Sequence, residues 1–113
     1  MKYLVLIYGD RQLLDALPEG EADSMMKECL AYADELRQGG HLLDAKALES
    51  AQAVTSLRVR QGRLIATDGP FAETKEQLGG FTLIEAKDLN EAIRLASRFP
   101  WARTGCVEVR PLS

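Results

Sequence analysis

The sequence predicts an α+β fold in which two amphipathic helices cover one face of an antiparallel sheet. Strand-like segments with alternating or continuous hydrophobicity occur beside two segments whose apolar residues recur every three or four positions, as in helices. Their order is strand, helix, strand, then a hairpin, then strand, helix, strand. Two such β-α-β units predict a ferredoxin-like subunit. A chain of 113 residues is long enough to form one domain with its own core over residues 1–113.

The first third of the chain predicts a strand, a helix and a second strand. Lys2–Tyr8 is apolar at both alternations, which is typical of a strand covered on both faces. Residues 21–38 carry an apolar stripe at helical spacing, and Gly39-Gly40 supplies a helix end. A strand is expected over His41–Glu49. The stripe comprises Ala22, Met25, Met26, Cys29, Leu30, Ala33 and Leu36, with Tyr32 beside it.

A β-hairpin is predicted in the middle of the chain. Val54–Arg60 and Arg63–Thr67 flank Gln61-Gly62, a two-residue connection of the kind that closes hairpins. Apolar and charged residues alternate in the first strand, so one face is expected to meet water. The second strand leads into a loop that begins at Asp68, and rigid scaffolds often present functional loops at such strand ends.

The last third predicts a strand over Gly80–Ala86, a second helix and a final strand over Gly105–Arg110. Asp88 and Glu91 fit a capping box at the start of this helix, and Pro100 ends it. The residues expected to face the core are Leu89, Ala92, Ile93, Ala96 and Phe99.

Helices on one side leave the other face of the sheet uncovered. An apolar set from the first strand must line that face, and packing against a second copy would cover it. We therefore expect a homodimer through the open sheet face. The set is either Tyr3, Val5 and Ile7 or Leu4, Leu6 and Tyr8.

Composition excludes several classes of partner. A net charge of −3 with interspersed signs gives no footprint for nucleic acid, and the arginines at 58, 60 and 63 fit the solvated face of a hairpin. Cys29 and Cys106 form no metal or disulfide pattern. The first strand is too short to span a bilayer and lacks the architecture of a signal peptide, so we expect no membrane partner and a cytoplasmic protein.

Familiar catalytic motifs are absent from the sequence. It has no serine-hydrolase elbow and no phosphate-binding glycine loop, and one histidine cannot build a multi-histidine metal site. We predict no metal and no cofactor. His41 could act as a catalytic base if Asp44 or Asp68 oriented it, or it could be a surface histidine after a helix C-terminus.

The segment from Asp68 to Glu76 is the best candidate site. Asp68 could serve as a general base, and Lys75 could bind an anionic group. Glu73 and Glu76 could act as a carboxylate pair. Gly69, Pro70 and Phe71 would shape the substrate-binding loop, together with Glu73 and Lys75. The structural alternative is that Asp68 caps a turn, Gly69-Pro70 bends the chain and Phe71 plugs the core.

A family resemblance rests on the same segment. Thr67–Glu76, with Asp68-Gly69-Pro70-Phe71 at its centre, and the following Leu78–Phe81 and Ile84–Ala86 resemble the DGPF branch of the YCII-related proteins. The ending Gly105–Pro111 is similar to that family's last strand. The resemblance implies a dimeric α+β barrel of ferredoxin-like subunits with the motif near a pocket at the dimer. It also implies links to regulation, because some DGPF-branch genes lie near alternative sigma factors, while a wider relative is a dehalogenase acting on lactones.

The wider group is thought to use a histidine in the first helix and an aspartate before a Pro-aromatic pair. Here the first helix has no histidine, and Phe99 stands before Pro100-Trp101. Any catalysis would then fall to Asp68 and its neighbours, with His41. The sequence thus predicts a homodimer that binds a small molecule, an anion among the options, and leaves enzymatic activity open. The alternative is a regulatory protein-interaction module that binds a protein such as a sigma factor.

Overall fold

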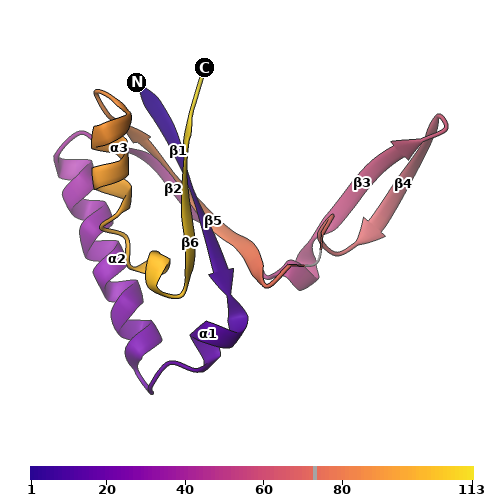
Figure 1. Cartoon of the computed structure of the whole chain (residues 1–113), viewed down its shortest axis with the longest axis horizontal. Helices are drawn as coiled ribbons and strands as arrows, with labels where there is room; N and C mark the ends of the chain where they lie inside the picture. The colour runs from indigo at the N-terminus through magenta and orange to yellow at the C-terminus, as the bar shows by residue number, and fades with distance from the viewer. Residues whose placement is uncertain (73) are drawn as a thin grey trace.

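The protein folds into a two-layered body and a projecting β-hairpin (Figure 1). The computed structural model describes residues 1–72 and 74–113. The radius of gyration is 16.0 Å, whereas a compact domain of this length is expected to have about 13 Å. The hairpin accounts for this extension, because it stands clear of the body in Figure 1.

The body contains a four-stranded antiparallel sheet with strand order β2-β5-β1-β6, so the predicted α+β class is confirmed. The central strands are β1 (Lys2–Asp10) and β5 (Glu76–Glu85), and the outer strands are β2 (Leu42–Ala47) and β6 (Gly105–Pro111). β5 is longer than predicted and begins before Gly80. A register shift where Gly80 and Leu78 face Ile7 and Tyr8 lets β5 continue past Gly79.

Two helices, α2 (Glu21–Gln38) and α3 (Leu89–Ala96), cover one face of this sheet (Figure 1). The core between them contains Tyr3, Val5 and Ile84 from the sheet. Because side chains alternate along a strand, Tyr3 and Val5 belong to the covered face of β1. Leu4, Leu6 and Tyr8 lie on the opposite, open face. The helical side contributes Tyr32, Leu36, Ala92, Leu95, Ala96 and Phe99 to the core.

The predicted helix stripes were wrong at their flanks. In α2, Met26 and Leu30 are exposed whereas Tyr32 is buried. In α3, Leu89 and Ile93 are exposed and Leu95 is buried instead. Each helix packs a narrower face than its hydrophobic pattern predicts, because one sheet covers only one side of it. The outer edge of each stripe therefore meets solvent.

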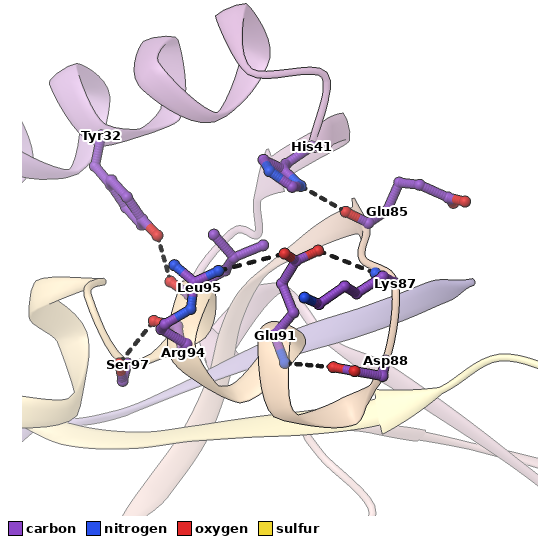
Figure 2. A network of polar contacts seen from close by, with 9 residues as sticks. All are labelled: Tyr32, His41, Glu85, Lys87, Asp88, Glu91, Arg94, Leu95 and Ser97. Carbon is purple, nitrogen blue, oxygen red and sulfur yellow. Dashed lines mark hydrogen bonds and ion pairs between the residues drawn. The ribbon is translucent and has the colours of Figure 1, made fainter.

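Helix α2 ends and helix α3 begins where local signals predicted, but α3 ends at Ala96 and not at Pro100, which starts a separate 3-10 turn. At the end of α2, the amide of His41 donates to Leu36 O at 2.8 Å and that of Gly40 donates to Arg37 O at 3.1 Å, a Schellman motif. At the start of α3, Asp88 accepts from the Glu91 amide at 2.9 Å (Figure 2). The Glu91 carboxylate accepts from the amide of Lys87, one residue before the cap.

Three short elements were not predicted. Helix α1 (Arg11–Asp15) follows β1 directly, because Asp10 caps it by accepting from the Gln12 amide at 2.9 Å. Short 3-10 turns occupy Ala51–Ala53 and Pro100–Arg103. Within residues 1–72 and 74–113, no helix has the length and hydropathy needed to cross a membrane.

The predicted hairpin is present as a separate two-stranded sheet of β3 (Thr55–Arg60) and β4 (Arg63–Asp68), which we call the arm. Gln61 and Gly62 close it with φ angles of +53° and +73°, as a two-residue hairpin turn requires. The arm leaves the body after β2 and returns to it at the start of β5 (Figure 1). Its base therefore lies beside one end of the main sheet.

Candidate functional site

A hollow of about 590 Å³ lies where the base of the arm meets the end of the main sheet. The end of β1, the start of β5, the segment between β2 and β3 and the loop after β4 all contribute to it. Most of its lining is apolar, with a few polar side chains among it, which is typical of small-molecule sites. Its lining residues include Tyr8, Glu49, Ser56, Pro70, Phe71 and Glu76.

The loop after β4 is tied to the base of the arm by hydrogen bonds. Gly69 has a φ of +106°, and its amide donates to Val54 O at 2.7 Å. Ser56 Oγ donates to Gly69 O at 2.6 Å, and Arg58 Nη2 donates to Phe71 O at 3.3 Å. On the loop side each of these bonds uses a backbone atom. The turn that the Asp-Gly-Pro sequence predicts is therefore held through its main chain.

Phe71 does not plug the core, so the structural alternative predicted for this residue is wrong. Its side chain is 81% exposed, the highest value among the exposed large apolar residues of the described chain. Gly69-Pro70 directs the chain past the end of the sheet, so Phe71 reaches the wall of the hollow and not the interior. A large aromatic ring left in water at a hollow is a feature of ligand and interface sites.

The other predicted site residues differ in whether they line a hollow. Pro70 and Phe71 line it, and so does Glu76. Lys75 lines an adjoining hollow of about 470 Å³. Asp68 lines neither hollow and is exposed at the end of β4, paired across the strands with Thr55. Glu73 lies outside the described residues.

His41 lies at the other end of the main sheet. Its Nδ1 donates to the backbone carbonyl of Glu85 at 2.8 Å, so the ring is oriented by a main-chain oxygen and not by Asp44 or Asp68 (Figure 2). Glu85 ends the ten-residue strand β5, whose first residue, Glu76, lines the hollow. A strand of that length separates its ends by roughly 30 Å. The structure thus does not bring His41 and Asp68 together within one chain.

The charges around the two hollows differ. Within residues 1–72 and 74–113, the charged side chains that line the larger hollow are Glu49 and Glu76. The adjoining hollow adds two cations, Lys75 and Arg11, of which Arg11 pairs with Asp15 at 3.3 Å. The described charged positions of the larger hollow are thus acidic, and the smaller hollow has mixed charge. An anionic ligand would fit better beside Lys75.

Burial shifts the pKa of two side chains in the helical layer, Cys29 and Tyr32. Burial raises the pKa of the Cys29 thiol, while a hydrogen bond donated by Trp101 Nε1 at 3.2 Å opposes that rise. Burial also raises the pKa of Tyr32, and the Arg98 guanidinium, 4.4 Å from the ring centre, opposes it. The Tyr32 hydroxyl donates to Leu95 O at 2.5 Å (Figure 2). These groups join α2 to the segment around α3 and lie away from the hollow.

Sequence reasoning missed several residues that line the hollow. Tyr8 belongs to the open face of β1, and Ser56 belongs to the base of the arm. Nothing in the local sequence marks them, because their approach depends on where the arm leaves the body. Across the described parts of the chain, no group of three or more His, Cys, Asp or Glu side chains is arranged to hold a metal ion.

The whole chain is similar to known proteins. The family model of the YCII-related domain matches residues 1–113. An uncharacterised protein of Rhizobium meliloti (strain 1021) is 39% identical over 115 residues, which cover 100% of this chain and 93% of that protein.

A solved structure shares the fold. It is 5-chloro-2-hydroxyhydroquinone dehydrochlorinase from Burkholderia phenoliruptrix AC1100, in complex with 2,5-dihydroxybenzoquinone. The TM-score is 0.51 with 14% identity, over 100% of this chain and 94% of that one. None of these likenesses points to an interaction with a sigma factor, and the DGPF branch stays a prediction. The match along the full sequence shows that this chain belongs to the YCII-related family.

Proposed function

We propose that this chain forms a homodimer that binds a small cyclic organic molecule in the hollow beside Pro70 and Phe71 and acts on it as an enzyme. One observation carries the proposal: an exposed aromatic ring and a mostly apolar wall meet a few polar side chains in one hollow. The dehydrochlorinase with the same fold, in complex with a dihydroxybenzoquinone, supports a ligand of this kind.

The lining indicates a flat ring with hydroxyl groups. The ring of Phe71 offers a face for stacking, which aromatic groups contribute in addition to the burial of their area. The carboxylates of Glu49 and Glu76 accept hydrogen bonds, and hydroxyl groups on a ring can donate them. A ligand that carries a carboxylate would place that group toward Lys75 in the adjoining hollow.

For the chemical step, Asp68 is our candidate general base, supported by Gly69 in the turn that positions the loop. The carboxylate of Asp68 is exposed in the single chain, so it requires a cover to exclude water before it can act efficiently. His41 could take part only from a second copy, because it lies at the far end of β5 in its own chain. Glu73 stays a candidate ligand contact.

The open sheet face supports the proposed homodimer. We interpret strand order β2-β5-β1-β6 as that of a ferredoxin-like subunit with the arm inserted, and two such sheets packed face to face would make a dimeric barrel. The open face is apolar along its centre and charged at its outer strands, where Lys46 pairs with Asp44 and Arg110 pairs with Glu108. Its central residues are Leu4, Leu6, Tyr8, Leu78, Phe81 and Leu83.

A binding panel tests the site. We expect hydroxylated benzenes and quinones to raise the melting temperature of the wild-type protein, because a ligand that binds only the folded state stabilises it. Phe71→Ala should remove that rise. Leu89→Ala, which trims another exposed apolar residue on the helical side, should keep it. If no ring compound shifts the melting temperature, or if both variants respond like wild type, the site lies elsewhere.

A further inference from the structure

The arm has one apolar face and one basic face. Residues paired across the two strands share a face, so Leu57 with Ala66 and Val59 with Leu64 form one apolar strip. The opposite face carries Arg58 beside Ile65 and the pair Arg60 and Arg63. Leu57, Val59 and Leu64 are each 60 to 67% exposed in the single chain.

Such an arm is not expected to be stable by itself. An isolated two-stranded hairpin is marginal in water unless a further strand or another surface covers its apolar face. β3 and β4 pack against each other, and no helix or other strand of the described chain packs against them to a similar extent. The apolar strip therefore requires a surface from outside this subunit.

The charges of the arm identify the kind of surface. Arg60 and Arg63 lie directly opposite each other, and like charges in that position repel unless an acidic group lies near them. The arm carries three arginines and one acidic residue, Asp68, so the rest of the chain is more negative than the net charge of −3. The body of a second copy thus has the complementary charge.

A second copy also completes the hollow. The hollow is bounded on one side by the base of the arm and the exposed Phe71, and its described charged lining is acidic. A basic arm arriving from another copy would cover that opening and exclude water. The arginines lie on the opposite face of the arm and stay outside such a contact, where charges mainly speed and direct association.

From these observations we propose that the β3–β4 arm packs its Leu57, Val59, Leu64 and Ala66 strip on the body of a second copy of this chain and closes the ligand hollow of the dimer. The inference shares the homodimer with the proposed function and adds an exchanged contact to it.

Hydrogen exchange of arm peptides, read with sedimentation of the same samples, tests the inference. We expect a dimer in which arm amides exchange at least tenfold more slowly than unstructured amides. Leu64→Ser should abolish that protection or raise the dimer dissociation constant at least tenfold. Ile65→Ser is the matched control, because it places the same polar residue next along β4 on the opposite face, and it should change either quantity less than threefold.

The opposite results are equally specific. Rapid exchange of the arm in a wild-type dimer would overturn the exchanged contact and leave a dimer through the sheet face intact. A monomer with a protected arm would show that something other than a second copy covers it. Equal effects of the two serine substitutions would overturn the assignment of the apolar strip. Binding of ring compounds to wild type, measured separately, keeps the ligand site distinguishable from each of these results.

Discussion

The body and the arm are built from similar strand sequences but differ in what holds them. In the body, Val5 and Ile84 are fully buried between the sheet and the helices. In the arm, Val59 and Ile65 have comparable side chains and stay largely exposed. The body therefore carries most of the stability of the single chain, while the arm carries exposed apolar surface. This difference is what the proposed contact with a second copy would explain.

Gly105→Ala should have the largest effect on the body. A Cβ at Gly105 would lie 1.9 Å from Tyr8 O and 3.1 Å from Gly9 Cα, and these backbone atoms cannot move without breaking the β1–β6 pairing. We expect a loss of about 4 kcal/mol or more in the free energy of unfolding, measured by urea denaturation. Gly62→Ala in the arm is the control. Its φ is +73° with open space around it, so it should cost only about 1 kcal/mol. Equal losses would mean that the arm is part of the same cooperative unit.

Two isoleucines, one in the body and one in the arm, allow the packing of these two regions to be compared. Ile84 is 0% exposed and Ile65 is 45% exposed. Ile84→Ala should lower the free energy of unfolding by about 3 kcal/mol, because it leaves a cavity in the core. Ile65→Ala should lower it by less than about 1 kcal/mol. Thermal and urea unfolding of both variants would decide this, and a large loss for Ile65→Ala would contradict the division of stability.

The contrast also shows what the sequence could predict. The bounds of α2 were predicted closely, because Gly39-Gly40 acts within the local chain. The hairpin was predicted for the same reason, through Gln61-Gly62. The exposure of Phe71 and the approach of Tyr8 to the hollow were not, since both depend on how the arm leaves the sheet. Placing a site between distant segments requires tertiary contacts that no local signal encodes.

Removal of two side-chain hydrogen bonds, one in the body and one in the arm, is expected to have smaller effects on stability. The Tyr32 hydroxyl donates to Leu95 O inside the body, while Ser56 Oγ donates to Gly69 O at the half-buried base of the arm. Tyr32→Phe should cost about 1 kcal/mol of unfolding free energy because the bond is buried. Ser56→Ala should cost less in global stability but loosen the loop that holds Phe71. Urea unfolding measures the first effect, and hydrogen exchange at the Gly69 amide measures the second. Faster exchange at Gly69 in Tyr32→Phe than in Ser56→Ala would contradict this assignment.

The smallest effect belongs to the turn of the arm. Gln61 has a φ of +53°, which costs a residue with an ordinary side chain more than it costs asparagine. Gln61→Asn creates the Asn-Gly pair that this kind of turn favours. We expect it to slow hydrogen exchange in β3 and β4 by two- to fivefold, which corresponds to about 0.5–1 kcal/mol of local stability. We expect the unfolding free energy of the body not to change, because β3 and β4 form a sheet separate from the main one. If the unfolding free energy of the body rises by the same amount, the arm and the body unfold together. In the proposed dimer, the contact between the two copies would transmit that coupling.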